Sequence, residues 1–467
     1  FGIGTETLNV LPSPKDVRTS APVRMLIVSH QMFRGYLDSY VEWKQRKGFL
    51  VTVAYTDSIG TTSTNIQNYI LEQYENATEQ LPAPTYLLLV GDVAQVPAFS
   101  SRCTSVDNQH VTDLYYSTWT EGDNIPDCYY GRFSATSIAH LNAQVEKTLM
   151  YEQYTFEDPT FLDKAVLVAG VDAASPSDNG YQYGDPALDY VSKFYVNGDN
   201  GYSQVIYYKN NTTINPNASN VEVRYNGGYS NSSQSAALRQ LYNQGAGWIN
   251  YSAHGYWNEW SMPEFTVAHA NSMSNTQKFG FMIGNCCLSS QFNMAQCLAE
   301  AVLRRGNYCG AVSYIGGSNS TYWGHDFCWT VGARSSIGAN MTHSYNASRK
   351  GVYDRLFHTH NESFSDWYNT AGSMIVAGNM AVEQYTTNAG FRLYYWEIYH
   401  VMGDPSVMPW LTQADSMVVD VPHVLSGATE VAVSSVPYAY VALTTDGGST
   451  LLGAAYSDAQ GNAVVNT

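Results

Sequence analysis

The sequence has few charged residues. Only 13% of its 467 residues are Asp, Glu, Lys or Arg, and 40 acidic residues outnumber 23 basic ones, so the formal net charge is −17. A field of this sign repels phosphate backbones and anionic lipid headgroups, so we expect no nucleic-acid partner. The low charge, together with 37 Tyr and 37 Gly, is typical of a secreted or cell-surface protein with a polar but weakly charged exterior.

Cysteines and long apolar runs are also scarce. Seven cysteines are too few for a disulfide scaffold and odd in number, so at least one thiol stays free within a monomer. No stretch approaches the roughly 18 uninterrupted apolar residues of a membrane span, and the opening Phe1-Gly2-Ile3-Gly4 does not resemble a signal peptide. We therefore expect no membrane span, and either a cytosolic protein or a processed mature form.

The first half of the chain alternates between two kinds of pattern. A chain of this length exceeds what one hydrophobic core usually supports, so we expect two or three domains. Apolar runs that end in small or acidic residues predict buried parallel strands at 23–30, 85–92 and 164–172. Helical patterns lie at 31–48, with Gly48 as its end, and at 64–73. This alternation predicts a doubly wound α/β sheet.

The α/β pattern returns after a region at 178–235 that is rich in Asn, Gly, Ser and Tyr and that we interpret as a loop. Further strands are predicted at 245–255, 278–287 and 307–318, and a helix at 293–305 that ends at Gly306. A break lies near 155–163. The sequence therefore predicts an N-terminal α/β subdomain over 1–159 and a second, catalytic α/β subdomain over 160–411.

The pattern of apolar and polar residues changes after Pro405 and Pro409. Short alternating apolar segments, separated by Gly, Ser and Asp, predict an all-β domain of Ig-like type over 412–467. The segment holds too few strands for a full sandwich, so we expect it to be truncated at Thr467.

Residue types that can take part in catalysis lie at the ends of four of the predicted strands. They are Asp92, Asp172, His254 and Cys287, and ligands and catalytic groups collect outside the carboxyl ends of parallel strands. A Cys nucleophile needs a nearby imidazole, which His254 can provide. The residues alone leave open whether this is a Cys–His pair, two satisfied core residues or a zinc site. Adjacent cysteines on a strand point to opposite faces, which disfavours zinc and leaves open which of Cys286 and Cys287 faces a partner.

Longer blocks resemble a known family. YSAHG, IGNCC, YWGHDFCW and YYWEIYHVMGDPSVMP are similar to the gingipains, secreted cysteine endopeptidases of caspase-like architecture, and to their lysine-specific members in particular. The likeness runs from about Val23 to the end of the chain. It implies a caspase-like doubly wound sheet in two subdomains, and a monomeric catalytic unit that acts on protein or peptide substrates. It also implies a protein secreted or attached to the bacterial outer cell surface.

The resemblance assigns roles to the residues at the strand ends. It makes Cys287 the nucleophile, His254 the catalytic imidazole and Asp172 the carboxylate that orients the imidazole. The oxyanion hole would consist of the backbone N–H groups of Gly255 and Cys287. The reaction would then be acyl transfer through a thioester, followed by hydrolysis.

The resemblance also implies a specificity pocket. It places Asp326 at the base of the S1 pocket, with Trp323 as an apolar wall and Ser252 as a nearby hydroxyl. A carboxylate attracts either basic side chain, so cleavage after Lys is the hypothesis and cleavage after Arg the alternative. Two features depart from the family: His325 stands where relatives have an acidic residue, and HGYWNEW replaces HGSETAW, which affects pocket shape and pH dependence.

An acidic loop predicts a cation site. Glu121, Asp123 and Asp127, with Asp92 from the preceding strand end, form an oxygen-rich set of the kind that calcium prefers. The residues alone leave open an acidic surface turn. The resemblance implies a structural calcium, with the carbonyl of Ile125 as a further ligand.

Two other classes of function are compatible with the composition. A non-catalytic adhesin or binding protein would use the tyrosine-rich surface and the terminal β domain, but it would not need Asp172, His254 and Cys287 together. An inactive zymogen would carry a pro-segment, and the chain begins without one, which favours the mature enzyme.

Overall fold

The computed structural model of the chain describes residues 21–107, 109–120, 123–172, 179–210, 217–226, 232–338, 343–421 and 427–467. Within these residues, no helix is both long and apolar enough to cross a membrane. All seven cysteines are free thiols.

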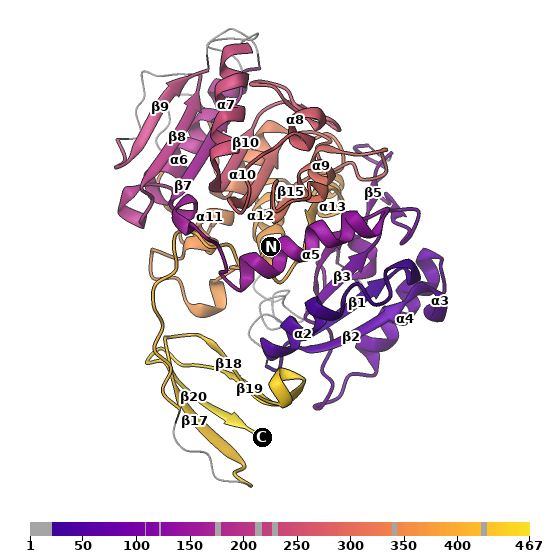
Figure 1. Cartoon of the computed structure of the whole chain (residues 1–467). Coiled ribbons are helices and arrows are strands. Elements are labelled where there is room, and N and C mark those ends of the chain that lie inside the picture. Colours follow the sequence, from indigo (N-terminus) through magenta and orange to yellow (C-terminus); the bar gives the residue numbers. More distant parts are fainter. Residues whose placement is uncertain are drawn as a thin grey trace.

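A single eleven-stranded sheet forms the centre of the molecule (Figure 1), in the order β2-β1-β3-β6-β16-β15-β14-β10-β7-β8-β9. Neighbouring strands are parallel except β15 and β16. The prediction of an α/β fold with a large, mostly parallel sheet is confirmed. The strands are β1 (Arg24–Ser29), β2 (Leu50–Tyr55), β3 (Tyr86–Val90), β6 (Tyr129–Phe133), β7 (Lys164–Ala169), β8 (Gln204–Lys209), β9 (Val221–Tyr225), β10 (Ala246–Ser252), β14 (Phe279–Asn285), β15 (Ser313–Gly317) and β16 (Tyr399–Met402).

Strand β16 reverses the direction of the sheet at its middle. It runs antiparallel to β15 and parallel to β6. The four strands on the β6 side therefore point opposite to the six strands on the β15 side. Consequently, the carboxyl ends of β3 and of β10 lie at opposite edges of the sheet.

Helices cover both faces of the sheet on the β15 side. Alternate residues of β10 contribute to two different cores: Trp248 to one, and Ile249 with Tyr251 to the other. The first core also takes residues from α6, α10, α11 and α12, and the second from α7, α8 and α9. The helices are α2 (Asp38–Arg46), α3 (Thr56–Ile59), α4 (Ser63–Glu75), α5 (Ile138–Glu152), α6 (Asp185–Phe194), α7 (Ser232–Gln244), α8 (Val267–Asn271), α9 (Leu298–Arg304), α10 (Trp323–Val331), α11 (Val352–Phe357), α12 (Ala371–Tyr385) and α13 (Ala389–Ile398).

The sequence predictions for individual elements are confirmed for most buried strands and corrected elsewhere. Region 178–235, interpreted as a loop, contains α6, β8 and β9. The helix expected at 293–305 begins only at Leu298, because Cys297 is its N-cap and Glu300 accepts the Cys297 N–H at 2.8 Å. Gly48 follows the end of α2 as predicted, with a φ of +84° that glycine adopts without strain.

The C-terminal segment is all-β, as predicted. It consists of two two-stranded antiparallel sheets, β17 (Glu430–Ser434) with β20 (Asn462–Asn466) and β18 (Tyr440–Thr445) with β19 (Thr450–Tyr456). Four described strands are fewer than the seven of a complete Ig domain.

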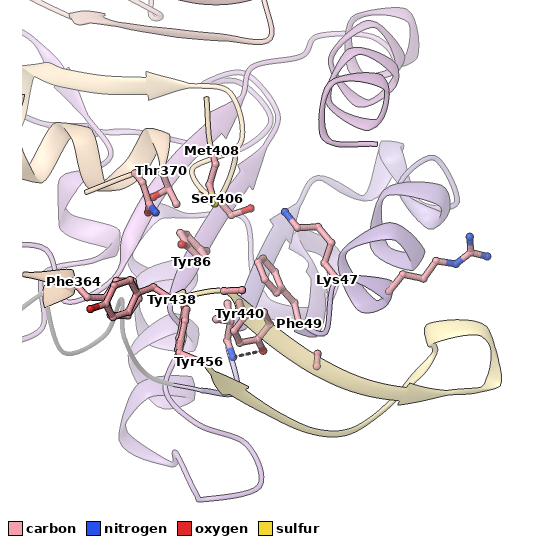
Figure 2. A pocket seen from close by; sticks show the side chains of 15 residues that line it. Lys47, Phe49, Tyr86, Phe364, Thr370, Ser406, Met408, Tyr438, Tyr440 and Tyr456 are labelled. Atoms are coloured by element: carbon pink, nitrogen blue, oxygen red, sulfur yellow. Dashed lines mark hydrogen bonds between the residues drawn. The ribbon is translucent and has the colours of Figure 1, made fainter. Parts of the chain in front are cut away.

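An aromatic contact joins the C-terminal segment to the first strands of the sheet. The Tyr440 hydroxyl donates to the carbonyl of Gly48 at 2.8 Å, and its ring packs edge-on against Phe49. Figure 2 shows the cavity of about 540 Å³ beside this contact, lined by Tyr86, Phe364 and other aromatic rings. Asp172, His254 and Cys287 are not among the residues that line it.

Three further short pairings involve the remaining strands. Their members are β4 (Phe99–Ser100), β5 (Val111–Thr112), β11 (Gly255–Tyr256), β12 (Glu259–Trp260) and β13 (Phe265–Thr266). Of these, β11 to β13 form a small sheet directly after β10.

Candidate active site

Three neighbouring strands end together and bring the predicted catalytic residues to one edge of the sheet. Ser252 at the end of β10 pairs with Asn285 of β14 on one side and with Ala169 of β7 on the other. His254 and Cys287 each follow two residues after their strand, and Asp172 three residues after β7.

His254 and Asp172 are directly hydrogen bonded. The imidazole Nε2 bonds Oδ1 of Asp172, while Oδ2 accepts hydrogen bonds from Asn179 at 3.2 Å from the backbone nitrogen and 2.8 Å from the side-chain nitrogen. Burial raises the pKa of Asp172, but the hydrogen bonds from His254 and Asn179 outweigh it, so the net pKa is below the ordinary value. The Asp172 carboxylate thus stays ionised. Because Nε2 of His254 is bonded to it, Nδ1 is the ring nitrogen that remains for other partners.

Cys287 lies in a tight turn after β14. The next residue, Leu288, has a φ of +63°, a left-handed conformation that costs a branched side chain free energy and is common at functional turns. The Cys287 sulfur accepts a hydrogen bond from the backbone N–H of Thr321 at 3.3 Å. Burial raises the pKa of the Cys287 thiol, the Thr321 N–H lowers it, and the negative charge of Asp326 raises it. No hydrogen bond joins the Cys287 sulfur to His254 in the described structure, which is common in free enzymes, where such bonds tighten only with substrate bound.

Gly255 packs directly against the turn that carries the thiol. A Cβ at Gly255 would lie 2.7 Å from the Cys286 sulfur and 3.0 Å from the Cys287 carbonyl oxygen, so only glycine fits. Ser261 N–H donates to the His254 carbonyl at 3.1 Å, which makes the next antiparallel pair, Gly255 with Trp260, a non-hydrogen-bonded pair. The Gly255 N–H therefore points away from β12.

Asp326 is a buried carboxylate, only 5% exposed, on the first turn of α10. Oδ2 accepts the hydroxyl of Thr321 at 2.6 Å, and Oδ1 accepts those of Tyr395 at 3.1 Å and Tyr399 at 2.8 Å. No Lys, Arg or His of the described residues forms an ion pair with it. Burial raises the pKa of Asp326 to about 6 because the three hydroxyls compensate desolvation only in part.

The remaining predicted specificity residues lie around this edge. Trp323 packs edge-on against His254, with ring centroids 5.5 Å apart. Ser252 is buried at the end of β10, and no hydrogen bond between the two described residues connects its hydroxyl to Asp326. His325 stacks on Phe391 with centroids 4.6 Å apart, and burial lowers its pKa to about 4, so it is neutral at pH 7.

Several residues of this site were not predicted. Asn179, Thr321, Tyr395 and Tyr399 provide hydrogen bonds to the two carboxylates. Tyr395 and Tyr399 lie in the YYWEIYH block that supports the resemblance, and their spacing of four was the available signal. For Thr321 the sequence offered no signal other than its position directly before YWGHD.

Asp92 does not belong to the predicted cation site. Asp127 lies two residues before Tyr129, where β6 begins, and Asp92 lies two residues after Val90, where the parallel neighbour β3 ends. The register separates them by eight residues along the sheet, about 25 Å at roughly 3.3 Å per residue. The prediction treated a strand end and the loop before the next strand as neighbours, but they lie at opposite ends of the pair.

Asp92 is instead part of a buried ion cluster. It pairs with Arg304 at 2.8 Å, and Arg304 pairs with Glu300 at 2.7 Å. This cluster links the end of β3 to α9. It also lies away from the edge that carries the catalytic residues, because β3 runs opposite to β10.

The other predicted cation ligands fit a metal only in part. Both oxygens of Asp127 already accept hydrogen bonds, from Thr120 and from the Trp119 N–H. Asp123 accepts the Ile125 N–H at 2.9 Å, and its pKa is raised by burial and by the charge of Asp127. Glu121 lies outside the described residues. Among those described, no group of three or more His, Cys, Asp or Glu side chains is arranged to hold a metal ion.

Comparison with known proteins gives a consistent result. Residues 18–410 match Peptidase family C25. Lys-gingipain of Porphyromonas gingivalis is 35% identical over 455 residues, which cover 96% of this chain and 24% of that protein. Gingipain R2 of the same organism is 24% identical over 311 residues, 64% of this chain and 37% of that protein. The chain therefore spans about a quarter of the length of the Lys-gingipains it matches.

Solved structures agree with these sequence matches. A structure described as a protease superposes with a TM-score of 0.81 at 32% identity, covering 96% of this chain and 92% of the other. The crystal structure of the Arg-specific cysteine proteinase gingipain R gives 0.74 at 20% identity, with coverage of 95% and 91%. This second likeness shows the fold alone. The sequence match over most of the chain and the shared identity with Lys-gingipain show that the chain belongs to peptidase family C25.

Proposed function

We propose that the protein is a cysteine endopeptidase that cleaves protein substrates after lysine. The observation that carries this proposal is the position of Asp326, a buried carboxylate without a cationic partner among the described residues. Asp326 and the Cys287 sulfur both form hydrogen bonds with the same residue, Thr321. A buried charge without a partner is costly, and a basic substrate side chain would supply the missing partner.

The chemistry follows from the groups at the strand ends. The Cys287 thiol gives its proton to His254, whose imidazolium is stabilised by Asp172, and the thiolate attacks the carbonyl carbon of the scissile bond. The N–H groups of Gly255 and Cys287 stabilise the oxyanion. His254 then protonates the leaving amine, and water hydrolyses the thioester to regenerate the thiol.

The hydrogen bonds of Asp326 favour lysine over arginine. Its Oδ1 already accepts two tyrosine hydroxyls and its Oδ2 accepts the Thr321 hydroxyl. Each carboxylate oxygen has about two lone pairs, so little capacity remains. A forked guanidinium prefers both oxygens at once, whereas an ammonium needs a single acceptor.

Matched reporters test both parts of the proposal. Peptidyl substrates that differ only in Lys or Arg at the cleaved position are compared by kcat/KM on the wild-type protein and on Cys287→Ala. We expect Lys to be preferred and the variant to be inactive. Faster turnover of the Arg reporter would replace lysine by the arginine alternative, and full activity of Cys287→Ala would remove Cys287 as the nucleophile. Absence of any cleavage would leave the binding-protein alternative.

We also propose that the enzyme acts outside the cytoplasm, secreted or attached to the cell surface, as the weakly charged, tyrosine-rich composition indicates. A structural calcium remains a separate proposal, now limited to Asp123, Asp127 and the Ile125 carbonyl, together with Glu121. Such an ion would stabilise the loop and takes no part in bond cleavage.

A further inference from the structure

Thr321 contacts both the thiol and the buried carboxylate. Its backbone N–H donates to the Cys287 sulfur at 3.3 Å, and its carbonyl oxygen lies 3.7 Å from the same sulfur. Its side-chain hydroxyl donates to Oδ2 of Asp326 at 2.6 Å. One residue, located between β15 and α10, therefore joins the two groups that the proposed reaction requires.

Hydrogen bonds fix the residues on both sides of Thr321. A movement of the Thr321 side chain is therefore passed on to its backbone and is not taken up by the neighbouring residues. The residues before and after Thr321 take part in three hydrogen bonds to two other segments of the chain, the turn after β14 and helix α13. These bonds run from Leu288 N–H to the Asn319 carbonyl at 3.0 Å, from the Tyr394 hydroxyl to the Ser320 carbonyl at 2.7 Å, and from Tyr322 N–H to the Tyr395 hydroxyl at 2.8 Å.

The charges at the two ends of this bridge oppose each other. An ionised Asp326 disfavours a thiolate at Cys287, while the Thr321 N–H favours it. Cys286, Tyr322 and Tyr394 also interact with Cys287 and are neutral near pH 7. Asp326 is the carboxylate that raises the pKa of Cys287, so its neutralisation would favour ionisation of the thiol.

We propose that Thr321 is a positioning residue that couples occupation of the Asp326 site by an ammonium group to the reactivity of the Cys287 thiol. The inference rests on the proposed function. A bound ammonium neutralises Asp326 and alters the hydrogen bond that Asp326 accepts from the Thr321 hydroxyl. The backbone N–H of Thr321 in turn donates to the Cys287 sulfur. The enzyme is then most reactive when a lysine side chain is in place.

The test measures thiol reactivity without turnover. The second-order rate of Cys287 alkylation by uncharged iodoacetamide is measured with and without saturating n-butylamine, which mimics the lysine side chain, and with 1-butanol as the uncharged control. We expect butylamine, but not butanol, to accelerate alkylation by about three- to tenfold, which corresponds to about half a unit to one unit in the thiol pKa.

Variants assign this coupling to Thr321. Thr321→Val removes the hydroxyl and is expected to lose most of the acceleration, while Thr321→Ser retains it. Thr330→Val is the matched control, because the buried Thr330 hydroxyl bonds the backbone carbonyl of Asp326 and not its carboxylate. With the Lys reporter, Thr321→Val is expected to lower kcat more than it changes KM.

Three outcomes would overturn the inference. The first is no acceleration by butylamine in the wild type, and the second is undiminished acceleration in Thr321→Val. The third is that Thr330→Val and Thr321→Ser lose as much of the acceleration as Thr321→Val does. A wild-type protein that cleaves neither Lys nor Arg reporters would instead contradict the proposed function. The two failures are distinguishable because alkylation requires no substrate cleavage.

Discussion

The imidazole of His254 is hydrogen bonded through Nε2 to Asp172, whose second oxygen is held by Asn179. The ring is thereby fixed with Nδ1 left for the reacting groups, and a positive charge on the ring is stabilised. The carboxylate comes from β7 and the histidine from β10, so parallel pairing of the two strands sets this geometry.

Replacing Asp172 by Asn should reduce kcat for the Lys reporter by about 10²–10⁴-fold, because an amide neither fixes the tautomer nor stabilises the imidazolium. KM should change little. Asn179→Ala, which removes one hydrogen bond to the same carboxylate, should have a much smaller effect. Equal losses in the two variants would indicate that the loop, and not the charge of Asp172, is what matters.

The preference for lysine should depend on pH through Asp326. Its pKa of about 6 means that the carboxyl is largely protonated at pH 5 and no longer attracts an ammonium. The ratio of kcat/KM for a Lys reporter to that for a matched norleucine reporter should therefore fall below pH 6, by up to about tenfold per pH unit. The norleucine reporter cancels the titration of His254 and Cys287. A ratio that is constant from pH 5 to 8 would contradict the assignment of Asp326.

Asp326 should also cost stability at neutral pH. Its folded-state pKa lies above the ordinary carboxyl value, so its contribution to stability is present at pH 4 and is lost as the pH rises through about 6. Asp326→Asn should thus raise the free energy of unfolding at pH 8, by about 1–3 kcal/mol in urea titrations, and have little effect at pH 4.

Asp404 provides the control of opposite sign. It forms a buried ion pair with Lys44 at 2.6 Å, and although burial raises its pKa, the ion pair outweighs this and lowers it. Its contribution to stability is present above the ordinary carboxyl pKa and is lost as the pH falls through the lower folded value. Asp404→Asn should therefore destabilise the protein at pH 8. Two variants that shift stability in the same direction would show that the charge state is not the cause.

Lys147 should be the most costly lysine to replace among those of α5 and α6. Its buried side-chain nitrogen lies within 2.8–3.1 Å of four backbone carbonyls, those of Val302 and Leu303 in the last turn of α9 and those of Arg305 and Cys309 in the segment after it. Lys147→Met removes the side-chain donor from all four carbonyls, of which that of Val302 keeps the Ala311 N–H, and should lower the free energy of unfolding by about 2–5 kcal/mol. The exposed Lys193→Met is the matched control. A loss below 1 kcal/mol would mean that water replaces the ammonium.

The calcium proposal predicts different effects for substitutions at the loop residue Asp123 and at Asp92, which lies outside the proposed site. If the ion binds the loop at Asp123, calcium added after treatment with a chelator should raise the melting temperature, and Asp123→Ala should abolish the rise. Asp92→Asn should leave the calcium response intact, although it weakens the ion pair with Arg304. A melting temperature that does not respond to calcium would argue against the site.

The sequence by itself determined which segments form the central strands and which residues follow them. Strands buried on both faces are mostly apolar along their length, so β1, β3, β7, β10 and β14 are visible as nearly continuous apolar runs. The region 178–235 was misjudged because its apolar positions are interrupted by polar residues, although α6 and β8 within it are largely buried.

Only the tertiary structure decided how these strands are oriented and which side chains meet. The four-residue strand β16 joins the two halves of the sheet and reverses their direction, which moves Asp92 to the edge opposite His254. No local pattern encodes this, because pairing between strands separated by about 270 residues depends on the whole packed core. For the same reason, the bridge through Thr321 follows from the packing of β14 against β15 and α10, and not from any spacing in the chain.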